Sequence, residues 1–153
     1  MIRKSYTIDI EAPVEKTFDL MLGLSNKSSY EQWTAEFNPT STIEGNWEQG
    51  SKMLFVGTDE NGNRGGMVSR IAAHIPNEYI SIEHYGILDG TNEIVEGPQV
   101  DEWAGGLENY RFEQIGTITK VRVEVDTTEG FADYFDSTYP KALQKLKGIV
   151  EAA

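Results

Sequence analysis

The sequence predicts an α+β fold in which a curved antiparallel sheet of about six to seven strands holds one long C-terminal helix. Three observations lead to this prediction. Short runs of β-forming residues recur between residues 41 and 127, and turn residues separate them. Two short helical patterns follow the first strand. Residues 128–150 carry apolar side chains at helical spacing, and such a helix buries its apolar face against the sheet.

The N-terminal segment predicts one strand and two short helices. Residues 4–11 alternate between apolar and polar side chains, which is the pattern of a half-buried strand. Pro13 suits the first turn of a helix, because that position needs no N–H, and Gly23 suits the end of the helix. A second helix is predicted over residues 26–34, and it carries Trp33.

The middle of the chain predicts successive hairpins, and strands joined by short turns form an antiparallel sheet. The dipeptide Asn61-Gly62 is the strongest turn signal, since both residues suit a tight hairpin. Residues 89–105 are rich in glycine and acidic residues and predict an irregular loop, either a lid or simply a mobile connection. The predicted strands are Thr42–Gly45, Lys52–Thr58, Gly66–Ile75, Tyr79–Leu88, Glu108–Ile115 and residues 117–127.

The C-terminal helix is predicted to begin after Thr128, a suitable N-cap residue. Pro140 cannot donate a backbone hydrogen bond, so we expect a kink there, but the apolar pattern resumes afterwards and the helix should continue. Wrapping a curved sheet around this helix should leave space between them, because large aromatic side chains cannot all interdigitate. The length of 153 residues is that of one domain, and we expect residues 1–153 to form it.

Composition excludes several classes of function. The chain has no cysteine, which excludes disulfide scaffolds, thiol nucleophiles and cysteine-held metal sites, and its two histidines exclude a histidine-rich metal centre. The formal net charge of −12 repels nucleic acids and anionic membranes. We expect no cofactor and no metal. No apolar segment has the length of a membrane span or secretory signal, so we expect a soluble, cytoplasmic protein.

A histidine and a glutamate form the first candidate for chemistry. On the strand 79–88, the more apolar face holds Ile80, Ile82, His84, Gly86 and Leu88, and we assign it to the interior. On the strand 108–115, Glu108 shares a face with two aromatic residues and should also point inward. We therefore hypothesise that His84 and Glu108 form a polar pair that orients a ligand or serves acid–base chemistry. The alternatives are a structural hydrogen-bonded pair and an error in the register of one strand.

Aromatic residues form the second candidate cluster. They offer large apolar walls with polar edges, which suits flat or amphipathic ligands, whereas the alternative for each of them is an ordinary core position. Trp33 and Trp103 fall in segments without strand pattern, and we expect them to cover the mouth of a cavity. The cluster consists of Trp33, Trp47, Phe55, Trp103, Tyr110, Tyr134 and Phe135.

Three motifs resemble the helix-grip superfamily, also called SRPBCC, which includes START lipid-transfer domains and polyketide cyclases. They are IEAPVEKTF at residues 10–18, WEQGSK at residues 47–52 and YPKALQKLK at residues 139–147, where Tyr139 occupies a position that is usually tryptophan. The resemblance spans almost the whole chain and favours the branch of the C-terminal domain of the activator of a heat-shock-protein ATPase.

The resemblance implies a ligand cavity between the sheet and the long helix. The first expectation is therefore binding of a small hydrophobic or amphipathic molecule in that cavity. The second is a partner of a chaperone ATPase, by analogy with the activator. The third is a cyclase- or hydrolase-type enzyme that uses His84 and Glu108. The superfamily has no universal catalytic motif, so no residue role is carried over, and fold alone does not decide among these functions.

Overall fold

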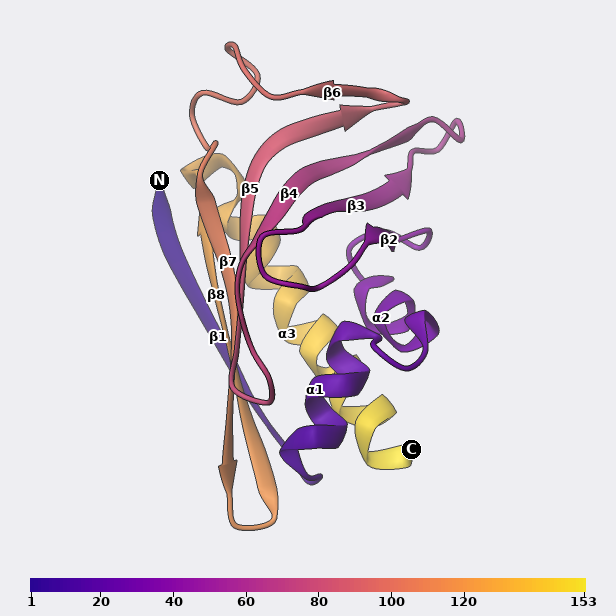
Figure 1. The fold of residues 1–153 in the computed structure, drawn as a ribbon, viewed down its shortest axis with the longest axis vertical. Coiled ribbons are helices and arrows are strands. Elements are labelled where there is room, and N and C mark those ends of the chain that lie inside the picture. The colour runs from indigo at the N-terminus through magenta and orange to yellow at the C-terminus, as the bar shows by residue number, and fades with distance from the viewer.

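The computed structural model covers residues 1–153 and consists of eight strands and three helices. The strands are β1 (Ile2–Ile10), β2 (Thr42–Gly45), β3 (Lys52–Thr58), β4 (Arg64–Ile75), β5 (Tyr79–Asp89), β6 (Asn92–Ile94), β7 (Gly106–Ile115) and β8 (Ile118–Thr127). The helices are α1 (Val14–Leu22), α2 (Lys27–Thr34) and α3 (Glu129–Ala152). Figure 1 shows the helices on the concave side of one curved sheet, which confirms the predicted α+β fold class.

The sheet has the order β1-β8-β7-β5-β4-β3-β2, all neighbours are antiparallel, and β6 pairs with β5 outside this path. Strand β6 corrects the prediction that residues 89–105 are irregular throughout. Strand β7 pairs only with residues 79–84 of β5, so the far end of β5 is left with a free edge. Residues 92–94 fold back and pair with that edge, where Ile94 lies opposite Ile87.

The helix boundaries follow the predicted signals. Gly23 ends α1 in the left-handed conformation, with φ of 68°, and its N–H donates to the carbonyl of Asp19. Asn26 caps α2 by accepting from the backbone N–H of Ser28. Helix α3 passes through Pro140 without ending, and Thr128 precedes it without a side-chain capping bond. None of the three helices has the length and apolar character needed to cross a membrane.

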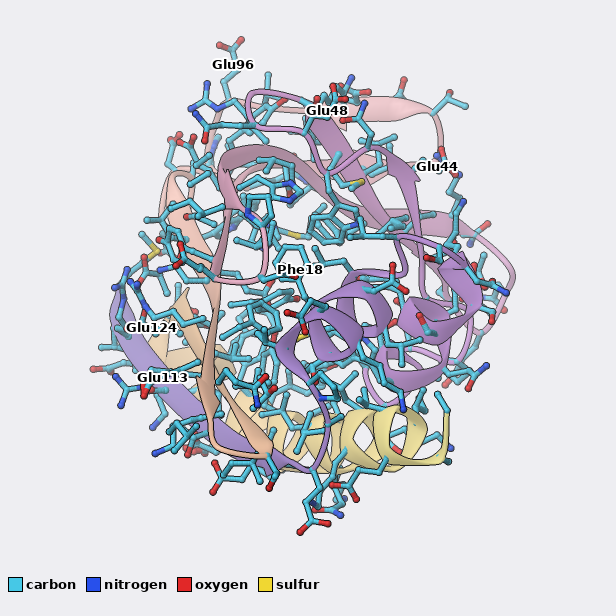
Figure 2. All side chains as sticks on the ribbon, turned by 60° about the horizontal axis from the view of Figure 1, so that its bottom comes forward. Phe18, Glu44, Glu48, Glu96, Glu113 and Glu124 are labelled. Atoms are coloured by element: carbon cyan, nitrogen blue, oxygen red, sulfur yellow. The ribbon has the colours of Figure 1, made fainter.

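The main core lies between the sheet and the helices, and the C-terminal half of α3 buries Ala142, Leu143, Leu146 and Val150 in it. Figure 2 shows Phe18 of α1 pointing into this layer, where its ring meets the edge of Phe112 on β7 at a centroid distance of 5.0 Å. Helices α1 and α2 both pack beside α3 here, as Figure 1 shows. The fully buried side chains of Met21, Leu22 and Leu146 close this end of the interior.

A β-bulge in β5 reverses the alternation of inward- and outward-facing side chains after His84. Ser69 of β4 lies opposite His84, but Val68 lies opposite Gly86, so Tyr85 is an extra residue. His84 therefore points inward as predicted, whereas the prediction for Gly86 and Leu88 is wrong. Leu88 instead joins a small second cluster with Val56 and Val68 on the outer face of the sheet.

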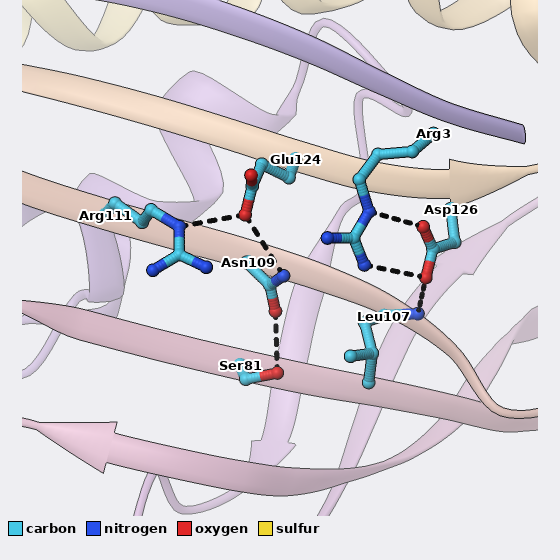
Figure 3. Close-up of polar contacts among 7 residues, drawn as sticks. All are labelled: Arg3, Ser81, Leu107, Asn109, Arg111, Glu124 and Asp126. Carbon is cyan, nitrogen blue, oxygen red and sulfur yellow. Dashed lines mark hydrogen bonds and ion pairs between the residues drawn. The ribbon is translucent and has the colours of Figure 1, made fainter.

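Paired charges and amides cover the outer face of β1, β8, β7 and β5 (Figure 3). Asp126 accepts two hydrogen bonds from Arg3, at 2.8 and 3.1 Å, and a third from the backbone N–H of Leu107 at 3.0 Å. Beside it, a second chain of contacts connects Ser81, Asn109, Glu124 and Arg111. The Arg3 guanidinium, aided by the Leu107 N–H, holds the pKa of Asp126 below its ordinary value.

The substitution Asp126→Asn should therefore destabilise the protein in a pH-dependent way. A pKa that is lower in the folded state stabilises the fold above the unfolded pKa, and this contribution is lost as the pH falls through the folded value. We expect a loss of roughly 1 kcal/mol at pH 7, which shrinks as the pH falls below about 4. Urea denaturation across this range measures it. Asp101→Asn, in an exposed loop, is the control, and equal curves for both variants would contradict the prediction.

Candidate functional site

Four polar side chains from four elements form one hydrogen-bonded chain in the interior. His84 of β5 lies opposite Ser69 of β4, and Glu108 of β7 lies opposite Ile82, two residues along β5. The Ser69 Oγ is 2.6 Å from His84 Nδ1, and His84 Nε2 is 2.9 Å from Glu108 Oε1. Tyr139 of α3 donates its hydroxyl to Glu108 Oε2. The predicted contact between His84 and Glu108 is confirmed, and we call the four residues the polar chain.

The proton positions in the polar chain follow from its partners. An ionised carboxylate only accepts hydrogen bonds, so His84 Nε2–H and the Tyr139 hydroxyl both donate to Glu108. Ser69 is fully buried, and His84 Nδ1 is the only acceptor within reach of its hydroxyl. In this arrangement the Ser69 hydroxyl donates to Nδ1, and the opposite ring nitrogen of His84 faces Glu108.

Aromatic rings surround the polar chain. Phe55 of β3 meets the His84 ring at a centroid distance of 5.6 Å, and Tyr6 of β1 stacks on Tyr139 at 5.1 Å. The ring of Phe37, which follows α2, contacts Tyr139 edge-on at 4.9 Å. These rings are walls of apolar surface around a few polar atoms, which is the usual composition of a small-molecule site.

Two buried phenols flank Glu108 and stay neutral. Burial raises the pKa of Tyr110 well above its ordinary value, and the charge of Glu108 raises it further. Burial raises the pKa of Tyr30 in the same way, with the charge of Glu108 as the next cause. Neither phenol therefore supplies a charge at neutral pH.

The interior is less completely buried at the end that holds the polar chain, which we call the open end. The side chains of His84 and Glu108 keep 16% and 15% of their surface exposed. Phe55, Met67 and Ile87 lie opposite one another on neighbouring strands and are only half-buried. Phe131, in the first turn of α3, is 61% exposed. These side chains are therefore only partly enclosed, although Tyr30 of α2 lies 6.4 Å from the Phe55 ring and Tyr139 of α3 reaches Glu108.

Two surface hollows lie elsewhere in the molecule. The larger, of about 1000 Å³, lies between α2 and α3, and the smaller, of about 390 Å³, lies beside the β4–β5 turn and β7. No predicted site residue lines either of them. The larger is lined by Gln32, Glu36, Pro140, Lys141, Gln144, Lys145, Gly148, Ile149, Ala152 and Ala153.

Three of the predicted aromatic residues belong to the closed core. Trp33 is completely buried, and its Nε1–H donates to the carbonyl of Met21 at 2.8 Å. Trp47 is buried as well and donates to the carbonyl of Leu22 at 2.9 Å. The buried ring of Tyr110 meets Trp33 at 6.1 Å. The expectation that Trp33 covers a cavity mouth is therefore wrong, because its indole is buried and donates to a carbonyl of α1.

The remaining predicted residues divide between the open end and the surface. Phe55 and Phe135 are half-buried, and the Phe135 ring lies 6.0 Å from that of Tyr139. Tyr134 is 42% exposed and donates to the carbonyl of Phe37. Trp103 is half-buried and donates to Gln99 within its own loop at 3.0 Å.

The loop that carries Trp103 does not favour the lid, one of the two alternatives for residues 89–105, at the point where it contacts the sheet. A Cβ on Gly86 would lie 2.9 Å from Val95 and 3.1 Å from Val68, a residue of the outer cluster. At Val95 the loop therefore covers the convex face of β5, on the opposite side of the sheet from the polar chain.

Sequence reasoning missed Ser69 and Tyr139 as members of the site. Tyr139 belongs to the apolar stripe of α3, and its position before Pro140 gave no indication that its hydroxyl reaches Glu108. Ser69 faces inward opposite His84 only because of the register of β4 and β5, which includes the bulge at Tyr85. No sequence signal marks either contact.

Comparisons with known proteins identify the fold. No protein-family model and no curated protein matches the chain. The solution structure of the Aha1 dimer from Colwellia psychrerythraea matches with a TM-score of 0.69 and 22% identity, over 99% of this chain and 97% of that one. A protein from Arthrobacter aurescens matches with a TM-score of 0.73 and 13% identity, over 99% and 87%. A protein from Cytophaga hutchinsonii matches at 0.72 and 16%, over 99% and 95%. At these identities the likeness shows the fold alone, which is the helix-grip fold.

Proposed function

We propose that this protein binds a small hydrophobic or amphipathic molecule between the sheet and α3, at the open end of the interior. The observation that carries the proposal is the polar chain from Ser69 to Tyr139, held among aromatic rings where His84 and Glu108 stay partly exposed. A few convergent polar atoms in a half-buried aromatic setting are typical of ligand sites. Phe55 and Phe135 supply apolar contact, and His84 with Glu108 supplies orientation.

The methionine methyl groups offer a direct test of where a ligand binds. Met67 lies half-buried at the open end, whereas Met21 is buried at the closed end. Titration with 1-naphthalenemethanol, a neutral aromatic probe, should shift the Met67 methyl resonance in NMR spectra and leave that of Met21 unchanged. Phe55→Ala should weaken binding roughly tenfold, since it removes an aromatic wall. Ile115→Ala, at the exposed end of β7, is the matched control.

Three outcomes would contradict this proposal. The first is a Met67 resonance that stays fixed at saturating probe. The second is an equal effect of Phe55→Ala and Ile115→Ala on affinity. The third is a change in NMR chemical shifts that is centred on the Ile149 methyl groups, which would place the probe in the hollow between α2 and α3 instead.

The likeness to Aha1, an activator of the Hsp90 ATPase, supports a second candidate function, in which the chain acts on a chaperone-type partner. An ATPase assay with and without this protein tests it, and unchanged turnover would remove it.

The hydrolase alternative has less support. Ser69 contacts His84 but is completely buried, so its hydroxyl has no route to a substrate carbonyl.

A further inference from the structure

The polar chain holds a carboxylate that pairs with no lysine or arginine. Both oxygens of Glu108 accept hydrogen bonds, one from the Tyr139 hydroxyl and one from His84 Nε2. None of the ion pairs formed by a lysine or an arginine includes Glu108. A carboxylate oxygen can accept two hydrogen bonds, so Glu108 keeps capacity for a further donor.

The other charged group on the inward face at this end is already neutralised. Lys4 shares the inward face of β1 with Tyr6, and its Nζ lies 3.1 Å from Asp136 of α3. Tyr6 donates to the same carboxylate at 2.8 Å. Lys4 therefore offers little attraction to an anionic ligand. Glu129 and Asp133, on the first turns of α3, offset the positive end of that helix.

Aromatic rings and long-range charge also favour a cation at this site. The rings of Phe55 and Phe135 are half-buried beside His84 and Tyr139, and ring faces attract ammonium groups. The chain carries 25 acidic and 13 basic residues, and the resulting negative potential raises the local concentration of cations.

We propose that the ligand of this site is an apolar molecule that carries a protonated amine, with the ammonium group on Glu108 and the apolar body against the aromatic walls. This inference rests on the proposed function and names its ligand class. The ammonium takes the place of the lysine or arginine that Glu108 lacks, while Ser69, His84 and Tyr139 fix the orientation of the carboxylate.

A matched set of probes tests the inference. The probes are 1-naphthylmethylamine, 1-naphthalenemethanol and 1-naphthoate, which share one aromatic body and differ in charge. We expect the amine to bind roughly tenfold more tightly than the alcohol, and the carboxylate to bind more weakly than either. Glu108→Gln should abolish the amine preference, so that the amine and the alcohol bind the variant with equal affinity. Glu113→Gln, on the outer face of the same strand (Figure 2), makes the same change in net charge and should keep the preference.

The outcomes separate this inference from the proposed function. If the alcohol binds at Met67 as tightly as the amine, or if Glu108→Gln keeps the preference, the ligand class is wrong and the binding function stands. Tighter binding of 1-naphthoate also overturns the ligand class and points to Lys4. If none of the three probes shifts Met67, both proposals fail. The comparison of the three probes on the unaltered protein tests the ligand class even where Glu108→Gln does not fold.

Discussion

The substitution Gly66→Ala should unfold the protein or destabilise it by at least about 4 kcal/mol. Gly66 lies in β4 opposite Val56 of β3, with φ of 143°, a conformation that residues with a side chain rarely adopt. A Cβ placed there would lie 1.8 Å from the Phe55 carbonyl oxygen and 2.9 Å from its carbon. Both atoms are backbone, so only separation of β3 from β4 can relieve the clash. That separation would also displace the Phe55 ring from His84.

Thermal unfolding and the neighbouring glycine provide the measurement and control for this prediction. Gly65 has ordinary backbone angles, and a Cβ there would meet its nearest neighbour, the Leu88 carbonyl oxygen, at 3.5 Å. Gly65→Ala should therefore change stability by less than about 1 kcal/mol. A Gly66→Ala protein that folds should melt roughly 10 °C or more below the parent. A melting temperature within about 3 °C of the parent would show that the strands relax more readily than the backbone contact implies.

Gly66 also shows where sequence-based prediction of the sheet ends. Alternation predicted every strand from β1 to β5 and the β7–β8 hairpin, because each has one buried face and the period of two records it. No periodic pattern in the sequence indicates a backbone angle, so the sequence does not distinguish Gly66 from its neighbour Gly65. The bulge at Tyr85 is equally hidden, and one extra residue was enough to misplace Gly86 and Leu88.

The candidate site was predictable only where it lies within one regular strand segment. Alternation placed His84 and Glu108 inward correctly. The pairing of β5 with β7 has no bulge between the buried pair Ile80 and Tyr110 and these two residues. Strand β6 is three residues long, and three residues show no period. Contacts between elements, such as that of Tyr139 with Glu108, depend on how α3 is seated on the sheet, which no local pattern encodes.

Trp33 illustrates the same limit, because an aromatic residue in a short helix can serve as core or as a ligand contact with the same local sequence. The structure shows why it is core. Its ring is completely buried, its edge contacts reach Tyr30 at 5.8 Å and Tyr110 at 6.1 Å, and its Nε1–H satisfies the Met21 carbonyl. These contacts join α2 to α1 and to β7 at the closed end of the interior.

Trp33→Ala should therefore cost about 3–5 kcal/mol of unfolding free energy, the usual range for removing a buried tryptophan. Urea denaturation should show this loss, whereas Trp103→Ala, which removes a half-buried ring bonded only within its own loop, should cost roughly 1 kcal/mol or less. Trp33→Phe keeps most of the ring, so it should fold and bind 1-naphthalenemethanol within about twofold of the parent. A large loss of affinity in Trp33→Phe, with stability retained, would show that Trp33 contacts the ligand. Equal destabilisation by Trp33→Ala and Trp103→Ala would show that the end of the interior beneath α1 and α2 is packed less tightly than its buried side chains indicate.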